Sequence, residues 1–445
     1  MNFNEIVKIV NGVLINTIKP NIKVQNIKID SRTIEKKDLF ICIKGKNFNG
    51  HDYIKDAIKN GAKAIIAEDN LNYKVNVPVI KVESTIHALE NLAKYQRNNY
   101  NGIVIGITGS VGKTTTKELL TSILREKYKV VSNIGNHNNL LGLAITLFNL
   151  KENTEVLITE LGMNHKGEIN RLSKIVKPHI GIITKIGTSH IGNLKSQKNI
   201  FKAKLEIING MNKGNLIING DDKYLNTIKP LKELKIIKCG QNKTNDFFCL
   251  NVKPYFNRTE FDIKLDNQIT HFIFNIPGLH LLTNILIVIK TSLLFGIDME
   301  LIKEKVSSYR PYDRRMKTYN YPLLKLIDDS YNSSYESLKG SIEVLNKFEN
   351  KLLIVGDILE LGKYSRKIHK KIGKLLKIPN AKILIIGKEM EILKKKYKHF
   401  KTNKELINYL EMLNLNNYTV LVKGSNILKL NEICTYLQKR FDINY

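Results

Sequence analysis

A glycine-rich turn near residue 110 carries the residue types best suited to chemistry. Thr108 to Thr115 read TGSVGKTT between an apolar run and an amphipathic segment. Glycines let backbone N–H groups approach phosphate oxygens, and the N-terminus of a following helix adds positive potential. Lys113 could reach the terminal phosphates of a nucleotide, and Thr114 could bind Mg²⁺. The motif is incomplete, because Ile107 occupies the first glycine position of the full phosphate-loop pattern. The main support for a phosphate site, as opposed to an ordinary turn, is therefore the strand before the motif and the helix after it.

Three further residues have types that could bind a metal ion. Glu160 ends an apolar run, and a carboxylate at the phosphate-loop edge of a sheet could hold Mg²⁺, although a solvated acid is the alternative. His190 follows another apolar run, where a single histidine is more often structural. Lys204 lies in a lysine-rich helical segment, where its type alone predicts a solvated side chain. Residue types alone leave these three roles open.

Apolar runs alternate with helical segments along the chain, which predicts an α/β protein of three domains. Residues 1–83 are expected to form a small α/β domain. Residues 84–313 are expected to form a central domain with a mostly parallel sheet around the phosphate loop. Residues 314–445 are expected to form a doubly wound, Rossmann-like domain.

The predicted strands are short apolar runs separated by turns or by segments of helical spacing. In the first domain they lie at 38–43, 64–67 and 77–82, with a helix at 51–60. In the second they lie at 103–107, 156–161, 180–186 and 216–218, with a helix at 114–128 and an antiparallel pair within 261–276. In the third they lie at 323–327, 352–355, 383–386 and 420–422, with a last helix at 427–440.

The charge and cysteine content exclude several classes of protein. The net charge of +30 comes from lysines spread along the whole chain, whereas a nucleic-acid surface would gather basic residues and aromatics on one element. The four cysteines form no paired motif, which argues against a zinc site and a disulfide framework. No basic segment precedes a long apolar stretch, and no run approaches 18 apolar residues. We expect a cytoplasmic monomer with no nucleic-acid partner and no membrane insertion.

Motifs spread over nearly the whole chain resemble those of the Mur ligases, in the order that the family has them. They are DSR at 30–32, DLF at 38–40, KG at 44–45, GHD at 50–52, TGSVGKTT at 108–115, GNHNN at 135–139, ELGMNHKGEI at 160–169, FKAKLEI at 201–207, PGLHLLTN at 277–284, DDSYNSS at 328–334, VGDILELG at 355–362 and VKGS at 422–425. The 328–334 and 355–362 segments most resemble the branch of the family that adds a dipeptide.

The resemblance implies a ligase that uses ATP to activate a carboxylate as an acyl phosphate, which an amine then attacks. It implies Mg²⁺ held by Thr114, Glu160, His190 and Lys204, with Lys204 carbamylated by CO₂ to supply an anionic oxygen. Lys113, Lys204, His190 and Glu160 would be the catalytic group. The implied nucleotide contacts are Gly109, Ser110, Val111, Gly112, Lys113, Thr114, Thr115, His280, Asn284, Arg315 and Asp329.

The resemblance also implies the substrates, UDP-N-acetylmuramoyl-tripeptide and D-alanyl-D-alanine, and the domains that hold them. The first domain would hold the UDP end through Ser31, Arg32, Lys44 and Gly45. Further substrate-facing residues would be Asn138, Asn139, Asn332, Asp357, Glu360 and Ser425. The carboxylates of Asp357 and Glu360 could attract the ammonium of the incoming dipeptide.

Some positions depart from the family pattern, and other functions compete with the dipeptide ligase. Leu279 stands where the family has a basic residue, Leu281 where it has asparagine, Ala144 where it has proline and Asn426 where it commonly has arginine. The competing functions are a sister Mur ligase or folylpolyglutamate-type synthetase that adds a single amino acid, a basic phosphate-loop ATPase that acts on nucleic acid, and a non-catalytic binding protein.

Overall fold

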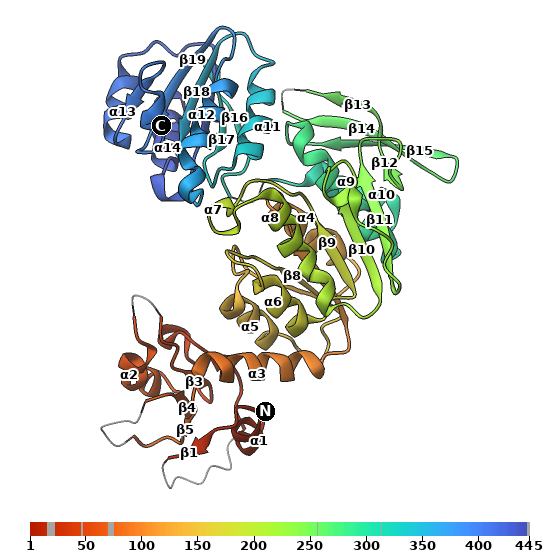
Figure 1. Ribbon diagram of the computed structural model, residues 1–445, viewed down its shortest axis with the longest axis vertical. Helices are drawn as coiled ribbons and strands as arrows, with labels where there is room; N and C mark the ends of the chain where they lie inside the picture. The colour runs from red at the N-terminus through yellow and green to blue at the C-terminus, as the bar shows by residue number, and fades with distance from the viewer. Residues whose placement is uncertain (16–22, 46–47, 70–74, 256, 312, 443–445) are drawn as a thin grey trace.

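The computed structural model describes residues 1–15, 23–45, 48–69, 75–255, 257–311 and 313–442 of the protein. Figure 1 shows three bodies along the chain, an N-terminal sheet at the bottom, a central sheet, and a C-terminal sheet at the top. The predicted α/β fold class is confirmed, because each body combines a mainly parallel sheet with helices. Among the described residues, no helix has the length and apolar character needed to cross a membrane.

The N-terminal body contains a five-stranded sheet in the order β1-β5-β4-β3-β2. Its strands are parallel except β1, which runs antiparallel to β5. The elements are α1 (Phe3–Ile9), β1 (Val13–Leu14), β2 (Ile27–Lys28), the 3₁₀ helix η1 (Ser31–Thr33), β3 (Leu39–Ile41), the 3₁₀ helix η2 (Gly50–Tyr53), α2 (Ile54–Lys59), β4 (Ala64–Ala67) and β5 (Val79–Lys81).

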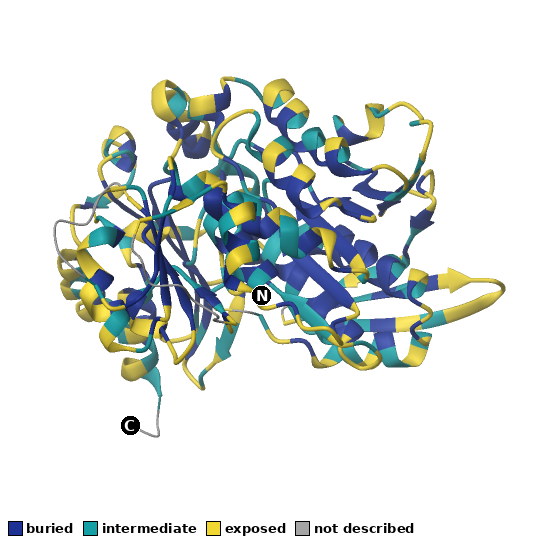
Figure 2. Ribbon diagram, turned by 90° about the horizontal axis from the view of Figure 1, so that it is seen from below, coloured by how far each residue is buried: buried dark blue, intermediate teal, exposed yellow. Residues whose placement is uncertain are grey.

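The central body contains a seven-stranded parallel sheet in the order β12-β11-β10-β9-β6-β8-β7. Its strands are β6 (Ile103–Thr108), β7 (Val130–Ser132), β8 (Val156–Glu160), β9 (Ile180–Ile183), β10 (Gly214–Asn219), β11 (Leu234–Gly240) and β12 (Phe247–Phe248). The inner strands β8 and β9 are fully buried, whereas β7 and β11 near the edges are only partly buried. Figure 2 shows buried strands inside the molecule and exposed positions mainly on the outer helices and loops. Because parallel strands end at one edge, the residues that follow β6, β8 and β9 meet there.

Helices cover both faces of the central sheet, and α3 leads into it from the N-terminal body (Figure 1). They are α3 (Thr85–Asn98), α4 (Lys113–Leu124), α5 (Leu140–Phe148), α6 (Glu168–Val176), α7 (Ile191–Leu194), α8 (Gln197–Leu205), α9 (Leu282–Leu294) and α10 (Met299–Ser308). α3 packs against α1 and against both α5 and α6. It therefore bridges the N-terminal and central bodies.

The predicted antiparallel pair within 261–276 is confirmed and belongs to a separate three-stranded sheet. Its strands are β13 (Leu250–Pro254), β14 (Thr259–Leu265) and β15 (Gln268–Phe274). Phe261 and Phe272 lie opposite each other in the register, and their stacked rings have centroids 5.3 Å apart. This pair anchors the buried face of the small sheet.

The C-terminal body has a six-stranded sheet in the order β16-β17-β21-β18-β19-β20, with only β16 antiparallel to its neighbour. Its strands are β16 (Lys317–Asn320), β17 (Leu324–Asp329), β18 (Lys351–Gly356), β19 (Ala381–Ile386), β20 (Lys398–Phe400) and β21 (Tyr418–Lys423). Its helices are α11 (Tyr335–Leu345), α12 (Ser365–Leu375), α13 (Asn403–Glu411) and α14 (Asn431–Phe441).

The predicted boundaries of three helices were wrong. The helix expected to begin at residue 51 begins at Ile54, after the 3₁₀ turn Gly50–Tyr53. The helix expected to reach residue 128 ends at Leu124, after which the polar segment forms turns. The helix expected from residue 427 begins at Asn431, because Lys429 has a left-handed backbone with a φ of 50°. A left-handed residue cannot continue a right-handed helix, so residues 426–428 form only a 3₁₀ turn.

Candidate active site

The phosphate loop links the end of β6 to the start of α4 and is held closely by its neighbours. Gly109 has a φ of 152°, and a Cβ there would lie 1.8 Å from Oγ1 of Thr184. Gly112 has a φ of 89°, and a Cβ there would lie 2.2 Å from Nδ2 of Asn284. Thr184 Oγ1 donates a hydrogen bond to the carbonyl of Val111 at 2.6 Å. Both glycines are therefore required by the packing of the loop as well as by its conformation.

Lys113 opens α4 with its ammonium turned back over the loop. Nζ donates a hydrogen bond to the carbonyl of Gly109 at 2.9 Å. Burial lowers the pKa of Lys113, while the charges of Glu160 and Glu360 oppose that shift and Arg315 adds to it. The side chain is thus placed in the loop where a phosphate would replace the carbonyl as its partner.

Glu160 ends β8 beside the phosphate loop, since its register partner on β6 is Ile107. Its side chain is only 1% exposed, and Oε1 has no hydrogen-bond partner among the described residues. Its backbone N–H donates to Oδ1 of Asn133 at 2.8 Å. A buried carboxylate oxygen without a donor is suited to a hard cation, so this observation fits the predicted Mg²⁺ role.

Lys117 lies on the buried face of α4 and was not singled out from the sequence. Its side chain is fully buried, with Nζ 2.9 Å from Oε1 of Glu118 and 3.8 Å from Oε1 of Glu160. Nζ also donates to the carbonyl of Asn133 at 2.5 Å and to that of Gly135 at 3.4 Å. Its position four residues after Lys113, between buried threonines, was the available signal. The lysine joins the phosphate-loop helix, Glu160 and the 133–139 loop.

The residue type of Lys204 alone predicted a solvated side chain, and that prediction was wrong. Lys204 lies on α8 with a relative exposure of 2%. Burial, with a further contribution from the positive charge of Lys113, holds the pKa of Lys204 well below its ordinary value. A lysine with a lowered pKa has a larger fraction of neutral amine, which is the form that reacts with CO₂. The environment therefore fits a carbamylated lysine.

His190 connects the central body to the C-terminal body. It precedes α7 with a left-handed φ of 62°, and its Nδ1 lies 2.7 Å from Oε2 of Glu360. The contact with His190 lowers the pKa of Glu360, although burial acts in the opposite direction. In the part of the chain that the structure describes, no three His, Cys, Asp or Glu side chains converge as a metal site. The predicted metal set therefore depends on oxygens from Lys204 and Thr114.

Predicted residues from separate elements line one cavity of about 430 Å³ next to the phosphate loop. Lys113, Asn138, Asn139, His190 and Lys204 are among them. Asn139 also caps α5 through a hydrogen bond from the backbone of Gly142, and the carbonyl of Asn138 accepts from Gly162. The remaining walls come from Gly162, Met163, Asn164, Leu140, Leu141, Ile86 and three residues of α6, Glu168, Arg171 and Leu172.

His280 packs where the central and C-terminal bodies meet. A Cβ at Gly278 or Gly340 would lie within 3 Å of its ring, so the two glycines leave room for the imidazole. Burial lowers the pKa of His280 to about 4, with Lys423 and Lys185 adding to this and Asp329 opposing it. The ring is neutral at physiological pH, and its Nδ1 has no hydrogen-bond partner among the described residues.

Arg315 and Tyr331 stack at the entrance to the C-terminal body. The guanidinium carbon of Arg315 lies 3.7 Å from the ring centroid of Tyr331, and Nη2 donates to Oγ1 of Thr114 at 3.5 Å. This contact places Arg315 at the phosphate loop. Its position fits the predicted contact with a phosphate.

Asp329 is held in place by hydrogen bonds from the protein itself. Its Oδ2 accepts from Nζ of Lys423 at 2.5 Å and from Oγ of Ser341 at 2.6 Å. Its Oδ1 accepts from the backbone N–H of Met316 at 3.2 Å. Lys423, which was not singled out from the sequence, also donates to the carbonyl of Asn332 at 3.1 Å. Asp329 therefore ties β17, β21 and the start of β16 together.

Asp357 and Ser425 form a buried hydrogen-bonded unit. Asp357 Oδ1 accepts from the backbone of Met390 at 2.8 Å, and burial raises the pKa of its carboxyl. The backbone of Leu359 donates to Oγ of Ser425 at 3.1 Å, and the backbone of Ser425 donates to the carbonyl of Asp357 at 3.0 Å. The unit fixes the start of the 357–362 loop, whose Glu360 reaches His190.

The predicted UDP residues lie apart from this cavity, in the N-terminal body. Ser31 opens η1, and Arg32 pairs with Asp30 at 2.7 Å while remaining largely exposed. The N–H of Gly45 donates to the carbonyl of Phe48 at 2.9 Å, and Lys44 forms an antiparallel bridge with Asn49. No residue of this group lines the cavity at the phosphate loop.

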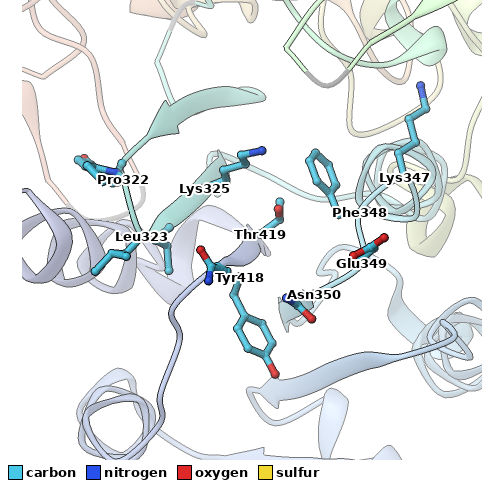
Figure 3. Close-up of a pocket in the computed structure, with 12 residues that line it drawn as sticks. Pro322, Leu323, Lys325, Lys347, Phe348, Glu349, Asn350, Tyr418 and Thr419 are labelled. Carbon is cyan, nitrogen blue, oxygen red and sulfur yellow. The ribbon is translucent and has the colours of Figure 1, made fainter.

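A second cavity of about 370 Å³ lies at the amino ends of β17, β18 and β21, at the opposite edge of the C-terminal sheet (Figure 3). Lys325, Lys347, Phe348 and Tyr418 are among its walls. None of the predicted site residues lines it. The phosphate-loop cavity is therefore the candidate active site.

Comparisons with known proteins find relatives that match nearly the whole chain. The family described as "Mur ligase family, catalytic domain" matches residues 23–97, "Mur ligase middle domain" matches 107–292, and "Mur ligase, glutamate ligase domain" matches 314–426. The chain is 33% identical to the UDP-N-acetylmuramoyl-tripeptide–D-alanyl-D-alanine ligase of Rickettsia prowazekii, over 95% of this chain and 97% of that one.

Two solved structures from other organisms share the fold along almost their full length. One is titled UDP-N-acetylmuramoylalanyl-D-glutamyl-2,6-diaminopimelate–D-alanyl-D-alanyl ligase from Acinetobacter baumannii, with a TM-score of 0.85, 27% identity and 98% of each chain covered. The other is MurF ligase from Thermotoga maritima in complex with ADP, with a TM-score of 0.85, 26% identity, and 95% of this chain and 99% of that chain covered.

Proposed function

The chain belongs to the Mur ligase family, and from that premise we propose that it joins D-alanyl-D-alanine to UDP-N-acetylmuramoyl-tripeptide with ATP. The product is the UDP-linked pentapeptide used in peptidoglycan synthesis. The named activity of the Rickettsia prowazekii relative supports this proposal, and the Thermotoga maritima complex with ADP supports ATP as the nucleotide. We place the reaction in the cytoplasm.

One observation carries the proposal for this chain's own residues. Lys113, Lys204 and His190 come from three different helices or loops, yet they line one cavity with Asn138 and Asn139. Its walls carry cationic and amide groups, which suit a substrate that carries phosphate and carboxylate charges. A carboxylate to be phosphorylated and the nucleotide that phosphorylates it can therefore meet here.

In the first step, the γ-phosphoryl group of ATP moves to the terminal carboxylate of the tripeptide. The carboxylate oxygen forms the bond to phosphorus as the bond to the leaving ADP oxygen breaks. Backbone N–H groups of residues 109–115 would bind the phosphates, and Lys113 would exchange its bond to the Gly109 carbonyl for a phosphate oxygen. Arg315, which already contacts Thr114, would add a second cation.

The chain's ligands for Mg²⁺ would be Thr114, Glu160, His190 and a carbamate on Lys204. When bound, Mg²⁺ neutralises charge on the phosphate oxygens. Oε1 of Glu160 has no hydrogen-bond partner among the described residues, which supports Glu160 as a ligand. The lowered pKa of Lys204 supports the carbamate. His190 would have to turn from Glu360, its present partner.

In the second step, the amine of the dipeptide attacks the acyl phosphate, and phosphate leaves with its bonding electrons. Glu360 is at the junction of the C-terminal body with the cavity, where its carboxylate could hold the dipeptide ammonium before that group loses a proton. Asp357, which is buried beneath it, would position this loop. Asp329 would accept a ribose hydroxyl at Oδ1, which accepts a single hydrogen bond from the backbone of Met316.

We assign residues 1–83 to the UDP end of the substrate, 84–313 to ATP, and 314–445 to the incoming dipeptide. In this division Ser31, Arg32, Lys44 and Gly45 hold the UDP end, His280 and Asn284 lie near the adenine, and Asn332 and Ser425 face substrate. The interbody contacts at His190 and His280 support a closed arrangement that excludes water from the acyl phosphate.

The experiment supplies the purified protein with ATP, UDP-muramoyl tripeptide and either D-alanyl-D-alanine or single amino acids. Phosphate release and the mass of the UDP-linked product are followed together. The proposal expects turnover and a pentapeptide only with the dipeptide. No phosphate release with the complete set, or equal turnover with a single amino acid, would contradict it. A Lys113→Ala variant should lower kcat by about 10²-fold or more.

A further inference from the structure

Arg171 lines the candidate active site, although neither its residue type nor the motifs of the family singled it out. It lies on α6 at the part of the cavity where Ile86, near the start of α3, also forms the wall. Because α3 follows the N-terminal body in the chain, this wall lies on the side of the cavity that faces that body. A substrate whose UDP end is bound in the N-terminal body would pass along it.

The guanidinium of Arg171 is oriented by Glu90 on α3. Nε donates to Oε2 of Glu90 at 2.7 Å, and Nη2 lies 2.5 Å from the same oxygen. Lys94 lies 2.8 Å from Oε1 of Glu90. Although burial raises it, the contacts with Lys94 and Arg171 hold the pKa of Glu90 below its ordinary value. The carboxylate of Glu90 is therefore ionised and holds the guanidinium in one orientation.

The pairing with Glu90 leaves donors of Arg171 available. Nη1 forms no hydrogen bond with any residue that the structure describes, and the side chain is 42% exposed. Because Glu90 is shared with Lys94, the three side chains together carry a net positive charge. An oriented guanidinium with open donors in a cavity is suited to a carboxylate.

The peptide of the proposed substrate carries carboxylates that do not react. The peptide named for the Acinetobacter baumannii relative contains a D-glutamyl and a diaminopimelate residue. A glutamyl residue linked through one carboxyl group keeps the other one free, and diaminopimelate keeps a second carboxyl group after one is activated. With the reacting carboxylate at Lys113 and the UDP end in the N-terminal body, the peptide must run along the wall that includes Arg171.

We propose that Arg171 binds a free carboxylate of the peptide portion of the substrate and so selects an anionic peptide. This inference rests on the proposed function. The bound group is either the free carboxylate of the glutamyl residue or the side-chain carboxylate of the third residue. Glu90 is a positioning residue in this scheme, because it acts only through Arg171.

The test measures binding of UDP-muramoyl tripeptide by calorimetry without ATP, using the wild type, Arg171→Gln and Glu90→Gln. Both variants remove the α3–α6 ion pair, but only Arg171→Gln removes the guanidinium. The expected result is a Kd raised about tenfold or more by Arg171→Gln, since a charge-assisted hydrogen bond is lost, and a clearly smaller effect of Glu90→Gln. Equal effects of the two variants, or an unchanged Kd in Arg171→Gln, would overturn the proposal.

Two forms of the tripeptide separate the possible carboxylates. With lysine as the third residue only the glutamyl carboxylate is present, and with diaminopimelate both are present. A loss of affinity for both tripeptides assigns the glutamyl carboxylate, and a loss confined to the diaminopimelate form assigns the third residue. In turnover assays, Arg171→Gln should raise KM for the tripeptide and leave KM for ATP within about twofold of wild type.

Failure of this inference differs from failure of the proposed function. Wild-type turnover with D-alanyl-D-alanine tests the function, whereas the binding measurement needs no turnover. Wild type that turns over normally while Arg171→Gln binds the tripeptide with unchanged affinity would overturn only the role of Arg171.

Discussion

The ammonium nitrogen of Lys117 lies 3.8 Å from Oε1 of Glu160, with both side chains almost fully removed from solvent. The lysine thereby balances the charge of a carboxylate that the proposed mechanism keeps open for a cation. It also holds the carbonyls of Asn133 and Gly135, which belong to the loop that carries Asn138 and Asn139. One buried charge thus positions parts of three elements at the phosphate loop.

Replacing Lys117 with methionine should lower the free energy of unfolding by about 3 kcal/mol or more, because Glu160 and two carbonyls lose their buried partner. Chemical denaturation followed by circular dichroism measures the change. Lys303→Met is a matched control, since Lys303 forms only an exposed pair with Glu300 and should change stability by less than about 0.5 kcal/mol. Equal effects of the two substitutions would show that Lys117 has no such role.

Lys204→Ala should reduce ligase turnover about a hundredfold or more, and short carboxylic acids should partly restore it, because they can supply the missing anionic oxygen. Lys202→Ala is the matched control, as Lys202 lies on the same helix but is exposed. Phosphate release with and without added formate or acetate provides the measurement. Full activity of Lys204→Ala without the acids would exclude a carbamate at this position.

The half-buried, neutral His280 should make the protein less stable in mild acid. Its pKa is lowered to about 4 from 6.5, so the unfolded chain binds more protons than the folded one between these values. The free energy of unfolding should therefore fall as the pH falls from about 6.5 to 4. His280→Asn should show a smaller fall over that interval in denaturant titrations. A pH slope equal to that of wild type would contradict the assignment, whatever the stability of the variant at pH 7.

Glu336 should help to dock the C-terminal body on the central body. Its Oε2 accepts hydrogen bonds from both the backbone and the hydroxyl of Thr188, at 3.0 and 2.9 Å. Glu336→Ala should therefore increase the radius of gyration in small-angle X-ray scattering. Glu343→Ala on the same helix should not, because Glu343 contacts only Lys339. An unchanged radius for Glu336→Ala would mean that the other interbody contacts suffice.

The phosphate loop could be predicted from the sequence because its signal is local. A strand, two glycines, a lysine and a helix follow one another within one short segment, and parallel strand ends meet at one edge of a sheet. The same rule anticipated that Glu160 would lie beside the loop. Its register opposite Ile107 places it there.

The residues that sequence reasoning missed depend on contacts between distant segments. Lys117 and Lys423 are buried lysines, and a lysine is ordinarily exposed unless a partner elsewhere in the chain compensates its charge. The buried ion pair of Asp329 was missed because its partner Lys423 comes 94 residues later. Short edge strands such as β7 and β12 were missed for a related reason, since so few residues carry no periodic pattern.

The bridging helix α3 contacts both the N-terminal body and the central body. Its first turn contributes Ile86 to the wall of the candidate active site. Further along, the hydroxyl of Tyr95 donates to Glu5 of α1, and Arg97 donates to the carbonyls of Val176 and Lys177 at the end of α6. A rotation of the N-terminal body would therefore move one wall of the cavity with it. Binding at the UDP end and the shape of the reaction site would thus be mechanically coupled through a single helix.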